Sequence, residues 1–219
     1  KHVIQTHSLD ELTLPGAWLT VGIFDGVHPG HRALLQRLVE GAMKASLPSV
    51  VLTFDPHPAV VLGKREDFKC LDTPAERLIL LESLGVSCTI TQPFAQDFAA
   101  QTAEEFARRM VRALGVRHLV IGHDSALGRG REGNAARLEE LGRGMGFSVE
   151  VVPPVLAGEE IISSSRIRQL VEDGEVAEAA GLLGRPHSLT GTVVHGDGRG
   201  RHINIPTANL QYPESRLIP

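Results

Sequence analysis

Strand-like and helix-like segments alternate along most of this sequence, and this alternation restricts the possible folds more than any other feature. Residues 18–24 (WLTVGIF) and 49–54 (SVVLTF) are short, β-rich and apolar almost throughout, as buried strands are. Between them, apolar residues from 34 to 42 recur at helical spacing. Residues 118–122 (HLVIG) and 147–152 (FSVEVV) again have the composition of strands. The pattern predicts an α/β fold, with a doubly wound parallel sheet covered by helices on both faces.

Two helix starts carry capping boxes. Thr73 precedes Pro74 and is followed three residues later by Glu76, and Thr102 is followed in the same way by Glu105. In this motif the threonine and the acidic residue satisfy backbone amides at the start of a helix. We therefore expect helices that begin at residues 74 and 103.

The pattern changes near Gly184. Residues 184–186 (GRP) break the last helix, and residues 188–210 alternate short β-rich runs with glycine-rich turns. Such a stretch is typical of the beginning of an antiparallel β-barrel, although these residues are too few to close a barrel core alone. We therefore predict two domains, an α/β domain over residues 1–183 and a partial β-barrel domain over residues 184–219.

Composition and charge argue against several classes of protein. Hydrophobic residues make up 42% of the 219 residues and charged residues 22%, and no window is apolar enough to span a membrane. A net charge of −4 with 4% aromatic residues argues against a nucleic-acid partner. Cys70 and Cys88 form no metal-binding or redox motif. We expect both to be buried free thiols in a cytoplasmic protein.

Residues 28–31 (HPGH) lie where the first apolar strand gives way to a helix. The unsatisfied amides and the positive end of the helix dipole favour an anion there, and Gly30 lets a ligand approach the backbone closely. His28 and His31 could donate hydrogen bonds to the phosphates of a nucleoside triphosphate. The alternative is an ordinary turn into a helix. The position between a strand and a helix favours the phosphate site.

Residues 162–170 (ISSSRIRQL) form a second candidate anion site. Three serines precede a helix with apolar periodicity, and the simplest interpretation is that they only cap it. A helix needs one serine as its N-cap, however, and the surplus hydroxyls stand beside the cations Arg166 and Arg168. If both candidate sites lie on the same edge of the sheet, they can bind a polyphosphate from two sides.

Five motifs, in this order, resemble a known family. They are residues 22–31 (GIFDGVHPGH), 53–58 (TFDPHP), 128–134 (GRGREGN), 162–168 (ISSSRIR) and 206–210 (PTANL). The first and fourth are similar to the paired motifs of the nucleotidyltransferase superfamily, whose fold is Rossmann-like. Together the five resemble the bacterial bifunctional riboflavin kinase/FAD synthetase family over essentially the whole chain.

The resemblance implies an FMN adenylyltransferase, in which the phosphate of FMN attacks the α-phosphorus of ATP to give FAD and pyrophosphate. An ionised phosphate needs no general base, so the site needs positioning, Mg²⁺ and hydrogen-bond donors. The residues expected to be catalytic are His28, His31 and Arg166. The residues expected to bind ATP and its phosphates are Gly22, Phe24, Asp25, Gly30, Asp124, Ser163, Ser164, Ser165 and Arg168.

The flavin side of the expected site departs from the family pattern. Where the family usually has aromatic residues, in a pattern like DFRFG, this chain has Ser125, Ala126 and Leu127. If the family's aromatic residues pack against the flavin, this chain binds flavin less tightly. The candidate flavin-binding residues are Asp55, His57, Ser125 and Leu127. The assigned nucleotide ligand Asp124 could equally be a turn or cap residue.

The last motif resembles the ATP site of riboflavin kinase. The resemblance implies that Thr207 and Asn209 bind Mg²⁺ and ATP phosphates and that a glycine-rich turn covers the nucleotide. The family's motif usually reads GFPTAN, whereas Asn204 and Ile205 precede Pro206 here. Riboflavin kinase activity is expected only with a complete barrel, which carries the family's catalytic glutamate. The expected kinase-site residues are Gly196, Gly198, Arg201, Thr207 and Asn209.

Two other interpretations stay open at this point, and the sequence argues against a third. A related nucleotidyltransferase that acts on another phosphorylated acceptor would explain the missing aromatic residues. A non-catalytic nucleotide- or flavin-binding module would keep both phosphate motifs without turnover. A class I aminoacyl-tRNA synthetase shares the two-histidine motif, but the sequence has no KMSKS-like loop and its acidic charge is wrong for tRNA. The expected partners are ATP, FMN and riboflavin, bound by a monomer or weak homo-oligomer.

Overall fold

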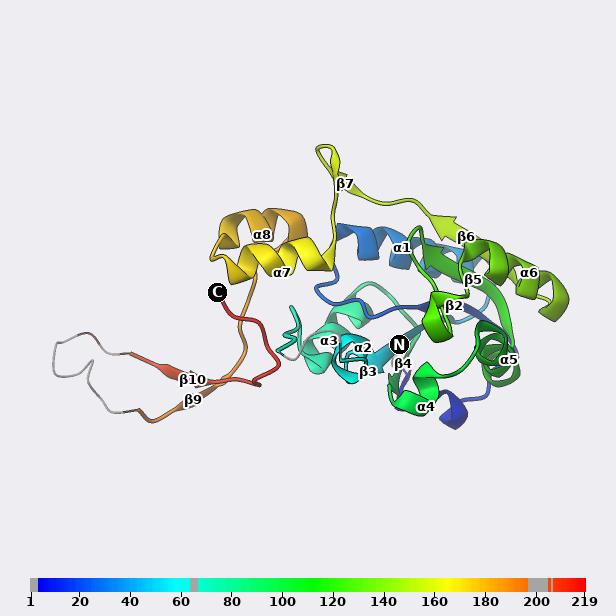
Figure 1. The fold of residues 1–219 in the computed structure, drawn as a ribbon, viewed down its shortest axis with the longest axis horizontal. Coiled ribbons are helices and arrows are strands. Elements are labelled where there is room, and N and C mark those ends of the chain that lie inside the picture. Colours follow the sequence, from blue (N-terminus) through cyan, green and yellow to red (C-terminus); the bar gives the residue numbers. More distant parts are fainter. Residues whose placement is uncertain (1–3, 64–66, 197–204, 206) are drawn as a thin grey trace.

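The computed structural model describes residues 4–63, 67–196, 205 and 207–219 (Figure 1). Its centre is a six-stranded sheet in which every neighbouring pair of strands runs parallel. The four strands expected from their apolar composition are present, and the predicted α/β fold with a Rossmann-like parallel sheet is confirmed. From edge to edge the strands are β1 (Ile4–Thr6), β4 (Cys88–Pro93), β3 (Ser49–Asp55), β2 (Ala17–Val21), β5 (Val116–Gly122) and β6 (Ser148–Val152).

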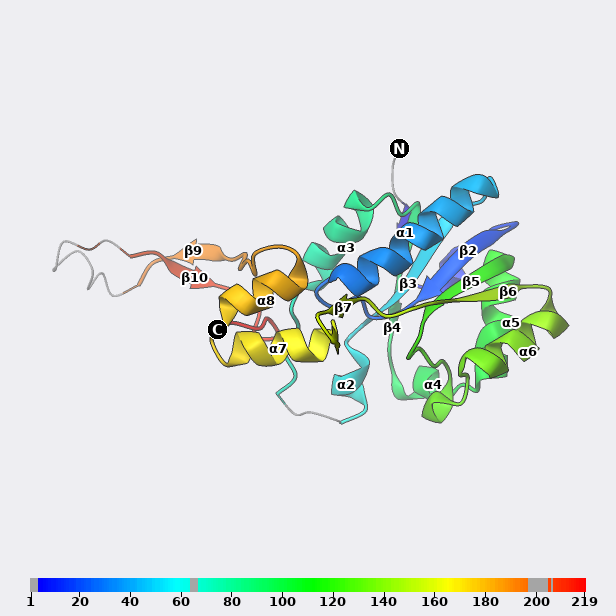
Figure 2. The ribbon, with the colours of Figure 1, turned by 90° about the horizontal axis from the view of Figure 1, so that it is seen from above.

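Different helices cover the two faces of the sheet (Figures 1 and 2). Helices α1 (Pro29–Lys44) and α3 (Pro74–Ser83) pack on one face, and α5 (Ala103–Leu114) and α6 (Ala135–Met145) pack on the other. Alternate residues of the strands join the two apolar clusters, because successive side chains of a strand point to opposite faces. Within the described part of the chain, no helix combines the length and the apolar character needed to cross a membrane.

Both predicted capping boxes form. The hydroxyl of Thr73 accepts from the amide of Glu76 at 3.2 Å, and the carboxylate of Glu76 accepts from the amide of Thr73 at 2.8 Å. Thr102 and Glu105 make the same reciprocal pair of hydrogen bonds, at 3.2 and 2.8 Å. Helices α3 and α5 therefore begin at the residues that the sequence predicts.

Shorter elements connect these parts. The helix pair α7 (Ser164–Glu172) and α8 (Val176–Leu183) lies beyond one end of the sheet and encloses its own apolar cluster (Figure 1). The remaining short elements are α2 (Pro58–Val61), α4 (Gln96–Ala99), the 3-10 turns Leu9–Glu11 and Arg129–Arg131, and the hairpin of β7 (Leu156–Ala157) and β8 (Glu160–Ile161).

The residues after α8 leave the α/β unit and return to it. Strands β9 (Thr192–Val194) and β10 (Asn209–Gln211) pair antiparallel in a ribbon that projects from the body of the molecule (Figures 1 and 2). Beyond β10 the chain folds back, so that Leu217 is 3% exposed and shares an apolar cluster with Leu71 and Leu183. The last residues therefore contribute to the core across the boundary predicted between 183 and 184.

Candidate active site

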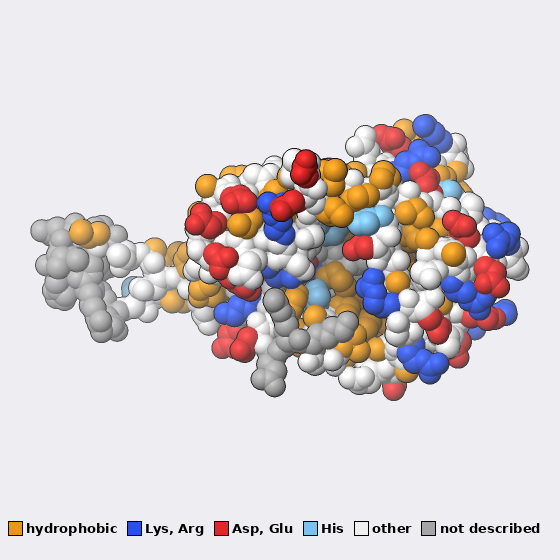
Figure 3. Space-filling view, turned by 45° about the horizontal axis from the view of Figure 1, so that its top comes forward, with side chains coloured by type: hydrophobic (Ala, Val, Ile, Leu, Met, Phe, Trp, Pro, Cys, Tyr) orange, Lys and Arg blue, Asp and Glu red, His pale blue; other side chains and the backbone are white. Residues whose placement is uncertain are grey.

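A cavity of about 940 Å³ opens at the carboxyl ends of the parallel strands, where ligands bind in sheets of this kind. Its walls come from the segments that follow β2 to β6 and from the start of α7. Figure 3 shows this face hollowed, with histidine and hydrophobic side chains around the hollow. Both phosphate motifs predicted from the sequence, residues 28–31 and 163–165, contribute to the wall of this one cavity.

The loop between β2 and α1 has a backbone conformation that few residues adopt. Gly26 has φ of +85°, and Phe24 and the β-branched Val27 have φ of +56° and +37°. Such conformations cost on the order of 1–3 kcal/mol each in residues with side chains and persist only where the surroundings impose them. A Cβ at Gly22 would lie 2.9 Å from the Phe24 ring, so a side chain at position 22 would displace that ring. The loop is therefore a constrained segment.

His28 is the N-cap of α1. Its Nδ1 accepts a hydrogen bond from the backbone amide of His31 at 3.4 Å, so the proton of the neutral ring is on Nε2. The two imidazoles stack with 3.7 Å between centroids, and the Phe24 ring meets His31 edge-on. Gly30 keeps this arrangement open, since a Cβ there would lie 3.1 Å from the His28 ring. His28 thus combines a structural cap with a free donor.

Both histidines are held in the neutral form. Burial lowers the pKa of His28 to about 4, and the opposing effects of the Asp25 and Asp124 charges do not restore it. Burial also lowers the pKa of His31 well below its usual value, with further lowering from His28 and Arg77. His31 Nδ1 is buried and has no hydrogen-bond partner among the described residues. Near neutral pH the site therefore offers uncharged imidazole donors.

Asp25 joins this loop to the start of α7. Its carboxylate is 2% exposed, and one oxygen accepts from Arg168 Nε at 3.2 Å. The other oxygen accepts from the amide of Asp72 at 3.1 Å. The Asp25 carbonyl accepts from the Ser164 hydroxyl at 2.7 Å. Arg168 also lies over the Phe68 ring, 4.8 Å from its centroid. These contacts hold the two phosphate motifs against each other.

The other residues of the serine motif have different surroundings. The Ser163 hydroxyl accepts from the amide of Arg166 at 3.3 Å and caps α7, while Ser165 is exposed at the cavity wall. Arg166 pairs with Glu160 at 2.6 Å and Glu178 at 3.4 Å, and it lies outside the set of described residues that line the cavity. The catalytic role expected for Arg166 therefore stays a prediction, and its position outside the described cavity wall does not favour that role.

Two candidate flavin residues lie at or just after the carboxyl end of β3, and only one of them, His57, lines the cavity. His57 also caps α2 by accepting from the Ala59 amide at 3.0 Å, and packs on the Phe68 ring at 4.0 Å between centroids. Burial lowers the pKa of His57 to about 4. Asp55 is exposed at the end of β3 and lies outside the described cavity wall.

The loop after β5 forms another part of the wall. The Ser125 hydroxyl accepts from the Gly122 amide at 3.0 Å, and Leu127 exchanges two backbone hydrogen bonds with Gly133. The Asp124 side chain is 80% exposed. All three of the predicted residues in this loop, Asp124, Ser125 and Leu127, line the cavity.

Four phenylalanines that the sequence analysis did not single out line the same cavity. Phe54 meets Phe94 and Phe98 edge-to-face, at 5.3 and 5.4 Å between centroids, and Phe98 meets Phe106 at 5.5 Å. Phe54 and Phe94 stand at the carboxyl ends of β3 and β4. That position, the edge where ligands bind in parallel sheets, is the signal that could have found them.

Of the expected kinase-site residues, the structure describes Gly196, Thr207 and Asn209, which lie in or next to the projecting ribbon. Gly196 is beside Asn209, because a Cβ at Gly196 would lie 2.1 Å from the Asn209 amide nitrogen. Thr207 is exposed. Gly198 and Arg201 lie outside the described residues.

Comparison with known proteins identifies the family. The model of the FAD synthetase family matches residues 11–166, and the riboflavin kinase model matches residues 183–219. A bifunctional riboflavin kinase/FMN adenylyltransferase from Listeria monocytogenes is 38% identical over 211 residues, which cover 96% of this chain and 67% of the relative. The chain belongs to the bifunctional riboflavin kinase/FMN adenylyltransferase family.

A second relative and a solved structure are also similar to this chain. The Escherichia coli K12 protein is 40% identical over 205 residues, 93% of this chain and 66% of that relative, so this chain spans about two thirds of the length of its curated relatives. A solved structure described as a macrolide-efflux protein from Streptococcus pneumoniae has a TM-score of 0.88 at 36% identity. The matched region covers 99% of this chain and 71% of the chain in the solved structure.

The buried histidines of this riboflavin kinase/FMN adenylyltransferase family member make its stability depend on pH. As the pH falls from 6.5 toward 4, an unfolded chain protonates residue 28 while the folded protein does not, so the free energy of unfolding falls. His28→Asn keeps an N-cap acceptor without the imidazole. Between pH 7 and pH 4.5, we expect the free energy of unfolding to fall by about 2–3 kcal/mol less in this variant than in wild type. Chemical denaturation at the two pH values measures both decreases. Equal losses in both proteins would contradict the lowered pKa of His28.

Proposed function

We propose that this chain transfers the adenylyl group of ATP to FMN, giving FAD and pyrophosphate. One observation carries the proposal: a single cavity joins a phosphate-binding end, at the starts of α1 and α7, to an end lined by four phenylalanines. FMN combines a phosphate with a large apolar ring, and ATP brings the second phosphate group. Membership of the FAD synthetase family supports the same assignment.

This reaction requires the phosphate end of the cavity to bind and orient the phosphates of FMN and ATP. It does not require a side chain there to transfer a proton. The phosphate of FMN is largely ionised near neutral pH. Its oxygen forms a bond to the α-phosphorus of ATP while the bond from that phosphorus to the pyrophosphate oxygen breaks. His28 donates from Nε2, because Nδ1 is engaged by the His31 amide. A donor fixed in this way before the substrate binds stabilises the charge that develops in the transition state.

The start of α7 faces the same substrate phosphates in this proposal. Free backbone amides at a helix N-terminus and the exposed hydroxyl of Ser165 are suited to an anion. Arg168 adds positive charge at the cavity wall, part of which Asp25 offsets. The role of Arg168 is therefore to fix the loop and the helix together as well as to attract phosphate.

We assign the flavin ring to the phenylalanine end of the cavity. Phenylalanines in edge-to-face contact present an apolar wall, and a planar aromatic ring buries much apolar surface against such a wall. The aromatic residues come from the ends of β3 and β4 and from the helices that follow, rather than from residues 125–127. The replacement of aromatic residues by Ser125 and Leu127 is therefore compatible with flavin binding.

Mg²⁺ fits the residues at the phosphate end. This ion usually binds through one or two carboxylates together with substrate phosphates and water. Both carboxylate oxygens of Asp25 are engaged, whereas the carboxylate of Asp124 is 80% exposed at the cavity wall. Asp124 is thus the residue that would hold the ion. When bound, Mg²⁺ would offset negative charge on the phosphates.

For the longer protein that the relatives represent, we also propose the phosphorylation of riboflavin to FMN by ATP. The match of residues 183–219 to the riboflavin kinase model supports this activity. Thr207 and Asn209 would offer the oxygen ligands that Mg²⁺ prefers.

The direct test is the conversion of FMN to FAD by the purified chain with ATP and Mg²⁺, followed by chromatography. We expect FAD from wild type, and about 10²–10³-fold lower kcat from His28→Asn, because one preorganised donor is lost while the cap remains. His7→Asn makes the same substitution at an exposed histidine outside the described cavity wall and should leave kcat unchanged.

Other results would favour the alternatives. Undiminished activity in His28→Asn would refute the donor role. No FAD from wild type, but adenylyl transfer to another phosphorylated acceptor, would indicate a related nucleotidyltransferase. Binding of ATP and FMN without any product would indicate a binding module. A parallel tube with riboflavin in place of FMN reports the kinase activity separately.

The flavin assignment predicts a selective effect of Phe98→Leu. This substitution removes an aromatic contact at the cavity wall, and we expect the KM for FMN to rise by about tenfold while the KM for ATP stays within about twofold. Phe147→Leu is the matched control, since Phe147 is 6% exposed in the core and outside the described cavity wall. Equal effects on both KM values, or none, would rule out flavin binding at this end.

A further inference from the structure

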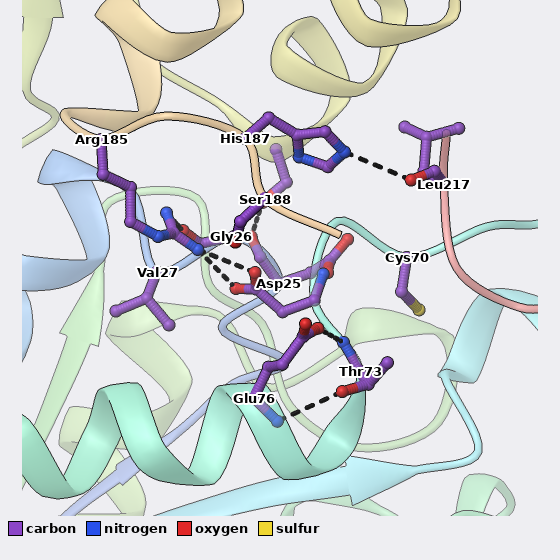
Figure 4. A network of polar contacts seen from close by, with 12 residues as sticks. Asp25, Gly26, Val27, Cys70, Thr73, Glu76, Arg185, His187, Ser188 and Leu217 are labelled. Atoms are coloured by element: carbon purple, nitrogen blue, oxygen red, sulfur yellow. Dashed lines mark hydrogen bonds and ion pairs between the residues drawn. The ribbon is translucent and has the colours of Figure 1, made fainter. Parts of the chain in front are cut away.

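Arg185 follows α8, in the segment matched by the riboflavin kinase model, and its side chain reaches the loop between β2 and α1 (Figure 4). Its Nη1 donates to the carbonyl of Gly26 at 2.7 Å. Its Nη2 donates to both carboxylate oxygens of Asp72 at 2.7 and 3.0 Å. The Asp72 side chain is 5% exposed and that of Arg185 is 21% exposed. The rigid guanidinium therefore joins two groups at once in a partly desolvated setting.

The contacts continue from Asp72 toward the cavity. The Asp72 amide donates to Asp25 at 3.1 Å, and Asp25 pairs with Arg168 at 3.2 Å. Of these residues, Asp25 and Arg168 line the cavity, whereas Asp72 and Arg185 lie outside its described wall. Arg185 is thus connected to the site through the loop, while its own side chain is not part of the described cavity wall.

The segment that carries Arg185 is itself fixed in place. Arg216, 1% exposed, donates to the carbonyls of Cys70, at 3.3 Å, and Ser188. Its Nε lies 3.4 Å from a carboxylate oxygen of Glu76 (Figure 4 shows this neighbourhood). Because both ends of the segment after α8 are anchored near α3, Arg185 is held against the loop by the fold.

We propose that Arg185 is a positioning residue for adenylyl transfer, which it serves by holding the Gly26 carbonyl and thereby the placement of His28. The inference rests on the proposed function. Gly26 and Val27 have positive φ and directly precede His28. Without Arg185 the Gly26 carbonyl loses its charged donor, and the strained loop relaxes toward other conformations. Through Arg185, the segment after Leu183 therefore helps to position the residues of the adenylyl-transfer site.

The test compares Arg185→Gln and Arg185→Lys with wild type in the full 219-residue chain. Glutamine carries no charge, and lysine keeps the charge but offers one nitrogen where arginine offers two. We expect Arg185→Gln to lower the kcat of FAD formation at least about tenfold per folded molecule, with the KM for FMN within about threefold. We expect Arg185→Lys to recover the thermal stability of wild type without recovering its kcat.

The control is Arg37→Gln, which breaks an ion pair with Glu150 away from the loop and should leave kcat unchanged. Circular dichroism gives the folded fraction used to normalise kcat. A kcat for Arg185→Gln within about twofold of wild type would overturn the proposal. A loss that follows only the folded fraction, or that Arg185→Lys repairs together with stability, would also overturn it. If Arg185→Gln does not fold, Arg185→Lys takes its place in the test. A kcat per folded molecule within about twofold of wild type in Arg185→Lys would then overturn the proposal.

A calorimetric titration with ATP alone separates this inference from the proposed function. If wild type makes no FAD, the proposed function fails, and the positioning role is then judged on ATP affinity. An ATP dissociation constant about tenfold higher in Arg185→Gln supports positioning of the phosphate loop, and an unchanged constant overturns it.

Discussion

Arginine donors hold the loop from Gly22 to His28, and the candidate active site depends on that restraint. Arg77 donates to the Ile23 carbonyl at 2.8 Å, Arg168 pairs with Asp25 at 3.2 Å, and Arg185 donates to the Gly26 carbonyl at 2.7 Å. These partners are 54, 143 and 159 residues apart in the sequence. The positive φ values of the loop therefore persist because α3, α7 and the segment after α8 all impose them.

In the proposed reaction, the restraint allows neutral histidines to act as donors to phosphate. An imidazolium would attract phosphate more strongly in water, but burial at the start of α1 disfavours the charged form. In a neutral His28 ring whose Nδ1 accepts from the His31 amide, Nε2–H is the donor, and the loop fixes the position of this group. In the proposed reaction, the helix N-termini and Arg168 supply the charge that attracts phosphate, and the phenylalanines supply apolar contact.

Local patterns predicted the fold well, because strand composition and capping boxes act over a few neighbours. Residues 28–31 and 163–165, the motifs predicted to bind phosphate, were also found from local sequence, and both line the same cavity. Local patterns could not separate Arg166 from Arg168. Both lie on one short helix two positions apart, on different sides, and only the packing of α7 decides which side meets the cavity. The phenylalanine cluster and the contact between Arg185 and Gly26 depend on the order of the strands and on distant segments, which periodicity does not encode.

The most direct test of this account is the protonation state of the His28 ring in the substrate-free protein. Long-range proton–nitrogen NMR spectra at pH 6, with His28→Asn to assign the signals, distinguish the two neutral tautomers and the imidazolium. We predict a neutral ring with the proton on Nε2, since Nδ1 accepts from the His31 amide and burial lowers the pKa to about 4. An imidazolium, or a neutral ring protonated on Nδ1, would contradict the account of a donor held ready by the loop.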